Sequence, residues 1–322
     1  MKKRIFSLLF ALIVGIHSLS AQHREQQEKS INQLEQEGRS QEVIAATQEV
    51  FRQAQNEQNS TLMMRAFLVA MGHRKNLSMD SLYVDIATLE QWAADPITPV
   101  SDAAMLHSLL GRIYTHSSQG RYDNMIKSPL PEDMSQWTRL MYHQRAFDHF
   151  AASVSRLEEL QGYSTLNYTP ITYTGRWSDM YQHNLMHFIG RRAVFGIRDL
   201  QYHLNGSFKQ TLWKEFALDY DHFHLDTLTA ASAYDCPTFV MRTFQQMLHL
   251  LEKERKSDSW LSMEQNRLNI IPQYDRDEKE YLRLFYKLKE EFSTSDLSGS
   301  ICYDIATILR RARSSASSAE VA

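Results

Sequence analysis

Two histidines four residues apart have the spacing of a metal site. His183 and His187 lie in a stretch whose apolar spacing predicts a helix from Ser178 or Asp179 to Leu200, so both imidazoles would share one face. Zinc proteases with this spacing have a glutamate directly after the first histidine as the general base. That position is an asparagine here, and no third ligand is placed. The pattern therefore favours polar residues at a helix–helix contact, with a zinc site as the alternative.

A denser group of metal-binding side chains lies in the sequence DYDHFHLD, which begins at Asp219. On a strand, alternating carboxylates and imidazoles would share one face and could bind a metal. The surrounding residues, 201–233, are rich in aromatic side chains but have weak periodicity, so they predict no clear element. We expect a solvated loop with local hydrogen bonds, and a metal site is the alternative. Its candidate ligands are Asp221, His222 and His224, flanked by Asp219 and Asp226.

Arg191 and Arg192 interrupt an apolar helical pattern. Arginines in such positions usually pair with carboxylates or bind backbone carbonyls, and anion binding is the minority interpretation. The chain has no glycine-rich phosphate loop, no Gly-x-Ser-x-Gly motif and no Walker motif. The residues therefore predict no catalytic residue and no cofactor, and the chain is expected not to be an enzyme.

Apolar residues at helical spacing predict the elements around these groups. Two helices with wide apolar faces are expected on either side of a break at Pro96 and Pro99, with Thr98 as the cap of the second helix. Helices with such faces need cover on more than one side, which indicates stacked helices. The apolar positions of the pair are Leu82, Ile86, Leu89, Ala93, Ala103, Leu106, Leu110 and Ile113.

Composition agrees with a helical fold. The 322 residues include only 11 glycines and 7 prolines, which is little turn material for a fold of many β-hairpins. We predict a mainly α fold of irregular stacked helical hairpins, similar to a tetratricopeptide-type α-solenoid, with a short extended segment near residues 163–176. The net charge of −3 gives no basic surface for nucleic acid.

Residues 1–21 have the features of a secretory signal peptide. Lys2, Lys3 and Arg4 precede an apolar run from Ile5 to Ile16, and small residues follow it. We expect an exported protein, periplasmic or associated with the cell surface, without a stable membrane span after cleavage. Export would place Cys236 and Cys302 where a disulfide is permitted, and the sequence leaves their pairing open.

The mature chain is expected to have two helical parts. A helical-hairpin array is predicted over residues 22–119, with helices separated at Gly38, and a second helical unit over residues 132–313. Gly120 to Leu130 is the loop between them. The residues after Arg313, 314–322, are small and polar and predict a disordered tail.

Several stretches resemble the N-terminal helical region of bacterial alpha-2-macroglobulin family proteins, in the version common in the Bacteroidetes. They are Met79 to Ala93, Ala103 to Tyr114, Tyr168 to Tyr173 and Asp179 to Ala193. Full-length members of this family trap proteases with β-sandwich domains, a bait segment and often a Cys-x-Glu-Gln thioester. Neither cysteine of this chain has that pattern, so the resemblance covers the helical part alone.

The resemblance implies a non-catalytic helical module of an endopeptidase-inhibitor family, which serves as a scaffold or a protein-interaction surface. Its partner would be another protein or the remainder of a larger macroglobulin-like chain. The alternative is a free-standing periplasmic adaptor, similar to tetratricopeptide proteins, that binds a protein or a peptide.

Overall fold

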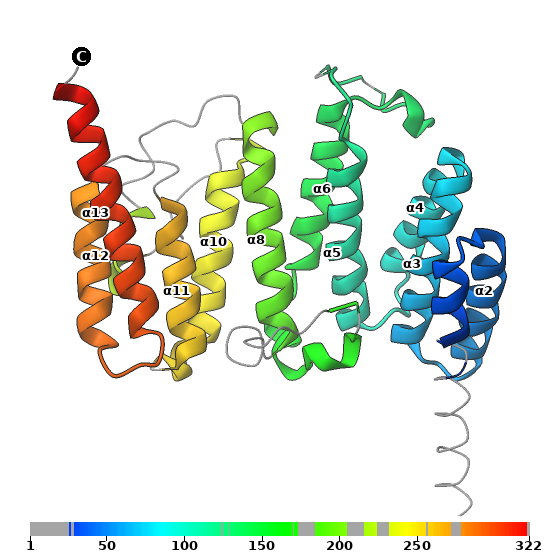
Figure 1. Cartoon of the computed structure of the whole chain (residues 1–322), viewed down its shortest axis with the longest axis horizontal. Coiled ribbons are helices and arrows are strands. Elements are labelled where there is room, and N and C mark those ends of the chain that lie inside the picture. The colour runs from blue at the N-terminus through cyan, green and yellow to red at the C-terminus, as the bar shows by residue number, and fades with distance from the viewer. Residues whose placement is uncertain are drawn as a thin grey trace, which may run out of the picture. The chain divides into compact units, whose positions relative to one another are not determined.

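The computed structural model of the chain is built from helices (Figure 1). It describes residue 26 and residues 29–123, 125–127, 129–169, 171–172, 184–204, 216–223, 232–255, 257–271 and 278–320, with side chains up to residue 311. In these ranges the only β-type pairing is an isolated bridge between Ser164 and Asn184. The mainly α fold predicted from the sequence is confirmed. No helix of the described ranges is both long enough and apolar enough to cross a bilayer.

The chain divides into two compact units, and the division lies inside helix α4 (Met79–Ala94), between Thr88 and Leu89. This division lies elsewhere than the loop Gly120–Leu130, at which we expected the boundary from the sequence. Helices α5 (Val100–Ser117) and α6 (Arg139–Ser153), on either side of that loop, pack against each other in the second unit.

The first unit contains helices α2 (Ser40–Asn56) and α3 (Ser60–Leu77), which pack on each other, and the start of α4. Gly38 precedes α2 with a φ of 70°, a left-handed conformation that glycine adopts at little cost. Asn59 caps α3, because its side chain accepts a hydrogen bond from the N–H of Leu62 at 3.0 Å. Both helix starts follow the turn residues that the sequence provides.

An ion pair joins α3 to the first part of α4. The Arg74 guanidinium donates through Nε and Nη2 to the Asp85 carboxylate, at distances of 2.8 to 3.1 Å. Asp85 is buried, so this two-pronged contact supplies the hydrogen bonds that its carboxylate needs.

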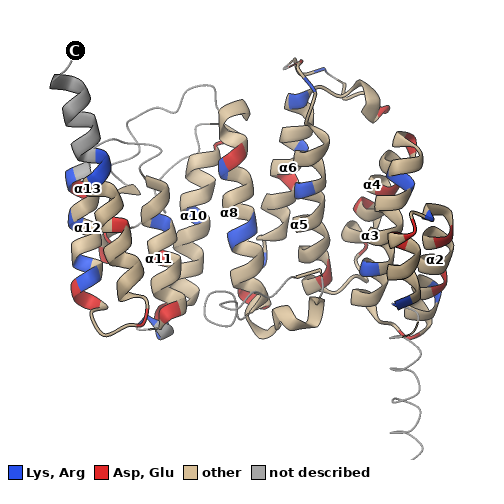
Figure 2. Ribbon diagram, in the orientation of Figure 1, with Lys and Arg blue, Asp and Glu red and all other residues tan. Residues whose placement is uncertain are grey.

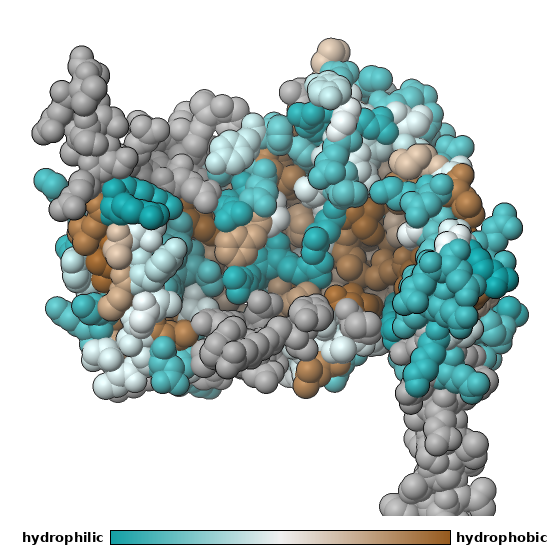
Figure 3. Space-filling model, in the orientation of Figure 1, coloured by the Kyte–Doolittle hydropathy of each residue, from teal (hydrophilic) through white to brown (hydrophobic). Residues whose placement is uncertain are grey.

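The surface of α2 is formed mainly by hydrophilic residues in the view of Figure 3.

The second unit is a series of helices in which each packs on the next. After α5 and α6 come α8 (Leu185–Leu204), α10 (Cys236–Leu250), α11 (Asp258–Ile270), α12 (Glu278–Glu291) and α13 (Ser298–Glu320). Short 3-10 helices lie between them: η1 (Met134–Gln136), η2 (Leu157–Gly162), η3 (Thr165–Tyr168), η5 (Tyr220–His222) and η6 (Glu252–Glu254). Helix α5 also contacts α8, so α5, α6 and α8 all pack on one another.

Phe150 of α6 sets the spacing of α5, α6 and α8. A Cβ atom added to Gly111 of α5 would lie 2.7 Å from its ring, and one added to Gly196 of α8 would lie 2.4 Å from it. The two glycines therefore let α5 and α8 approach the ring more closely than any other residue would allow. Farther along, His143 of α6 hydrogen-bonds Ser118 and its ring packs on His203.

The contacts at Phe150 and at His143 mark two levels along the helices, and together they define the direction of each helix. From Gly111 to Ser118 and from Gly196 to His203 the residue numbers rise, whereas from Phe150 to His143 they fall. Helix α6 is thus antiparallel to both α5 and α8, and those two are parallel. Residues of α5 and α8 whose numbers differ by about 85 lie at the same level.

Several predicted boundaries differ from the structure. Within the unit expected over residues 132–313, helix α6 begins only at Arg139, because the Thr138 hydroxyl caps it, and the 3-10 helices η1 and η2 flank it. The segment expected to be extended contains η3, and residues 170 and 173–176 lie outside the described ranges. The cap expected at Thr98 is wrong, since its hydroxyl donates to the Trp92 carbonyl and Pro99 precedes α5.

The C-terminal part also differs. Helix α11 was not predicted, because its buried residues lie all around the helix and leave no clear apolar stripe in the sequence. These buried residues include Trp260, Leu261, Glu264 and Arg267. The tail predicted to be disordered, residues 314–322, continues helix α13 up to Glu320. The expected signal peptide, residues 1–21, lies outside the described ranges.

Candidate functional site

The connection between α5 and α6 is long and well anchored. Three groups at the start of α6 donate to carbonyl oxygens within it: the Thr138 hydroxyl to Met125 at 2.7 Å, the Arg139 N–H to Asp123 at 3.0 Å, and the Trp137 indole to Pro131 at 2.7 Å. Trp137 itself is buried and stacks on Tyr114 of α5. The connection is therefore fixed to the helix pair at both ends and in its middle.

This connection displays apolar side chains to solvent. Four of them are exposed by half or more: Tyr122 by 85%, Met125 by 68%, Ile126 by 55% and Leu130 by 50%. We call residues 121–131 the apolar loop; residues 124 and 128 within it lie outside the described ranges. Large apolar side chains grouped on one anchored loop are typical of an interaction site rather than of ordinary surface.

Only one histidine of the predicted pair His183 and His187 lies in the described ranges. His187 is fully buried near the start of α8, where its Nδ1 lies 2.7 Å from the Asn184 side-chain oxygen. The same oxygen accepts the His187 backbone N–H at 3.1 Å, so Asn184 orients the imidazole against its own helix end. His183 lies outside the described ranges.

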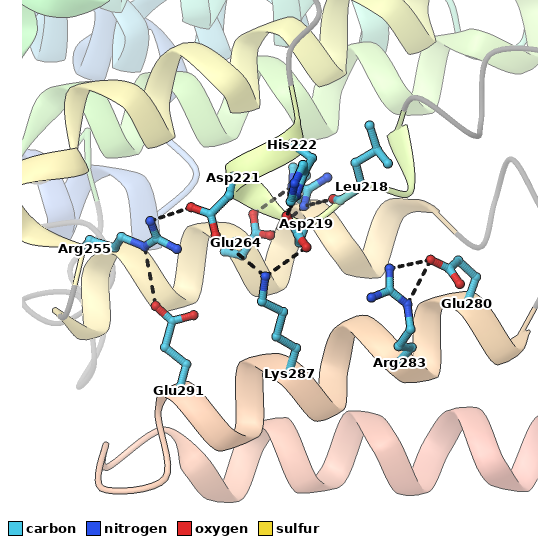
Figure 4. Close-up of polar contacts among 11 residues, drawn as sticks. Leu218, Asp219, Asp221, His222, Arg255, Glu264, Glu280, Arg283, Lys287 and Glu291 are labelled. Carbon is cyan, nitrogen blue, oxygen red and sulfur yellow. Dashed lines mark hydrogen bonds and ion pairs between the residues drawn. The ribbon is translucent and has the colours of Figure 1, made fainter.

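The described part of the DYDHFHLD sequence, residues 219–223, is a short polar turn that faces later helices (Figure 4). The Asp219 carboxylate lies 2.9 Å from Nζ of Lys287, and Asp221 lies 2.7 Å from Nη1 of Arg255. His222 is exposed, and its Nδ1 lies 2.6 Å from Asp219. The carboxylates predicted as metal ligands are thus bound to cations, and His224 and Asp226 lie outside the described ranges.

Ionisation of these carboxylates follows from their partners. Burial of Asp219 opposes ionisation, but hydrogen bonds from Lys287 and His222 outweigh it and lower its pKa to about 2. The hydrogen bond from Arg255 lowers the pKa of Asp221 as well. Beside them lies a cavity of about 20 Å³, room for about one water molecule and too small for an organic substrate. Within the described ranges, no three His, Cys, Asp or Glu side chains group where they could hold a metal ion.

Arg267 of α11 binds the backbone just before this turn. Its guanidinium is fully buried and donates to the carbonyl oxygens of Phe216 and Leu218, each at 2.8 Å, and to the Glu264 carboxylate. It also lies 4.1 Å from the centre of the Phe223 ring. The arrangement fixes residues 216–223 on α11, which is a structural task.

A second polar cluster was not predicted from the sequence. In the second unit, Oε1 of Glu90 accepts hydrogen bonds from the Tyr114 hydroxyl, Nε of Arg145 and Nε2 of His149, each at 2.9 Å. Nδ1 of His149 lies 2.9 Å from Nδ1 of His107. Glu90 of α4 is thereby bound to both α5 and α6. Long sequence separations hide this cluster from any local pattern.

No group with a shifted pKa in this cluster titrates near neutral pH. Burial opposes ionisation of Glu90, but hydrogen bonds from His149 and Tyr114 and the charge of Arg145 lower its pKa to about 2. Burial, together with the charges of His149 and Arg145, lowers the pKa of His107 to about 4. Burial and the Glu90 charge raise the pKa of Tyr114. At pH 7 Glu90 is therefore charged, whereas His107 and Tyr114 are neutral.

The two cysteines do not form a disulfide with each other. Cys236 is buried at the first turn of α10, and Cys302 is exposed on α13. Burial raises the pKa of the Cys236 thiol to about 12, so it is protonated at neutral pH. The pairing that the sequence left open is absent from this structure.

No protein-family model matches the chain, and neither a curated protein nor a solved structure matches it. The class that the structure defines is a mainly α-helical protein, and the relation to alpha-2-macroglobulins stays a prediction.

Proposed function

We propose that this chain is a non-catalytic helical module that binds a protein partner through its apolar loop. The observation that carries the proposal is the combination of exposure and anchoring in residues 121–131. Tyr122, Met125 and Ile126 expose more than half of their surface, whereas the backbone beneath them is bound to the first turn of α6.

The physical argument concerns the cost of binding. An anchored loop loses little conformational entropy when a partner covers it, so less of the free energy gained by burial of its apolar side chains is offset on binding. Aromatic and long apolar side chains of this kind dominate the energetics of protein–protein interfaces. The titratable clusters described above are occupied by internal ion pairs, which supports binding rather than catalysis as the role.

Site-specific photo-crosslinking in producing cells tests the proposal. A photoreactive amino acid at Ile126 is expected to give a discrete adduct with one protein. The same amino acid at Tyr202, 75% exposed near the end of α8, provides a control surface on the same unit and is expected to give no such adduct. Equal labelling at the two positions, or none at Ile126, would contradict the proposal.

Export and a macroglobulin-like setting belong to the same proposal and rest on the sequence. In that setting the partner is the remainder of a larger macroglobulin-like chain. For a free-standing adaptor it is a separate periplasmic protein or peptide. Identification of the adduct by mass spectrometry distinguishes the two.

A further inference from the structure

Arg192 of α8 is an arginine without a counter-charge in the described structure. Its Nη1 atom is buried and makes no hydrogen bond to any described group, and its guanidinium lies 4.9 Å from the centre of the Phe188 ring. Burial and the charge of Arg112 lower its pKa to about 10. Arg192 as a whole is half-buried, but a buried guanidinium nitrogen that makes no hydrogen bond is unusual, because desolvation of its charge is costly unless an anion compensates for it.

Arg112 of α5 is the second cation at this place. It is exposed, and no described carboxylate forms an ion pair with it. The charge of Arg112 opposes that of Arg192, because two guanidinium cations repel each other. Two like charges on neighbouring helices destabilise the fold unless something negative lies between them.

The register of α5 and α8 places a third group at the same level. Gly111 and Gly196 contact the same Phe150 ring, so the residues one turn earlier on the two parallel helices, Ser108 and Arg192, also lie at one level. Ser108 is fully buried, and its hydroxyl makes no hydrogen bond to a described group. Side chains on helices lean toward the N-terminus, which directs Arg112 back toward the level of Ser108.

We infer that Ser108, Arg112 and Arg192 form a binding site for a small oxyanion between α5 and α8. The two guanidinium groups supply charge and several N–H donors, and the serine supplies one O–H donor. This is the set of donors that a phosphate or a carboxylate accepts, often with two bonds from one arginine. The site is separate from the apolar loop and does not depend on the proposed function.

Isothermal titration of the full chain with inorganic phosphate and, separately, with acetate tests this inference. Chloride at equal ionic strength controls for general screening. Saturable binding of either anion supports the site, and the better of the two identifies the class of oxyanion. An Arg192→Gln variant is expected to bind about tenfold or more weakly, because a charge-assisted pair is lost. Arg198→Gln is the matched control on the same helix, since Arg198 already pairs with Asp199 at 2.6 Å.

A second variant keeps the test informative if binding is weak. Arg192→Met removes the charge and keeps much of the side-chain volume, so it is expected to raise the melting temperature in anion-free buffer. Phosphate should raise the melting temperature of the wild type, and this increase should be absent from Arg192→Met. If wild type shows no saturable response to either anion, or if Arg192→Gln binds as wild type does, the inference is wrong.

Discussion

Glu90 and His149 lie 59 residues apart in sequence, and Nε2 of His149 is 2.9 Å from Oε1 of Glu90. The contact joins the last part of α4 to α6, and Tyr114 and Arg145 complete it with two further hydrogen bonds. A single carboxylate oxygen thus joins α5, α6 and the part of α4 that belongs to the second unit.

Replacement of Glu90 by glutamine should destabilise the protein at neutral pH by about 1–3 kcal/mol, since hydrogen bonds to a charged acceptor are weakened. The folded-state pKa of Glu90 is lowered from 4.5 to about 2. Its contribution is therefore present above pH 4.5 and is lost as pH falls toward 2. Chemical denaturation of both proteins at several pH values should show their stabilities converging in that window. A constant difference down to pH 2 would contradict this account of Glu90.

The buried histidines give a second pH signature. Burial lowers the pKa of His143 to about 4, and the charges of His203 and Arg139 act in the same direction. The unfolded chain takes up these protons near pH 6.5 and the folded chain does not, so stability should decrease as pH falls from 6.5 to about 4. Imidazole NMR signals provide a direct check: His143 and His107 should remain neutral at pH 5.5. A midpoint near 6.5 for either ring would disprove the burial argument.

Close packing around Phe150 predicts a graded glycine-to-alanine series. Gly111→Ala and Gly196→Ala should each destabilise the protein by about 1–3 kcal/mol, because the ring lies between them and cannot retreat from both. Gly72→Ala on α3 meets nothing within 4 Å and should stabilise by about 0.5–1 kcal/mol through helix propensity. Thermal unfolding of the three variants gives the order. Stabilisation by all three would mean that the helices do not pack at this distance.

Loss of Arg267 should be among the most damaging single changes. Arg267→Met leaves the buried Glu264 carboxylate without its partner, which costs about 3–5 kcal/mol. Amide hydrogen exchange should increase across residues 216–223, which lose two carbonyl contacts. Arg283→Met, which breaks the exposed pair with Glu280, is the matched control and should change stability by less than about 1 kcal/mol. Similar effects of the two variants would contradict the anchoring role of Arg267.

Apolar periodicity predicted most of the helices, although not α11, and much of their core. Leu82, Ile86 and Leu89 share one stripe in the sequence and are all buried in α4, and the same holds for Leu106 and Leu110 of α5. Local spacing reports which side of a helix is covered, but not by what. The division of the chain into units therefore escaped prediction, because it depends on how the helices pack and not on loop length.

The polar sites show the same limit. Asp219 and Asp221 have the spacing of metal ligands, but Lys287 and Arg255, which bind them, come from residues much later in the chain. Tyr114 and His149 carry no local signal that relates them to Glu90. The apolar loop was predicted as a loop, and only the structure shows that its backbone is bound while its apolar side chains are exposed.

The binding role of the apolar loop is tested most directly by affinity. Once crosslinking at Ile126 has identified the partner, its dissociation constant is measured for wild type, for Tyr122→Ser/Met125→Ser/Ile126→Ser, and for Tyr202→Ser. The triple variant should bind at least about tenfold more weakly with unchanged circular dichroism, since interface anchors of this kind contribute more than 1 kcal/mol each. The Tyr202 variant should bind as wild type does. Equal affinities for wild type and the triple variant would contradict the proposed function.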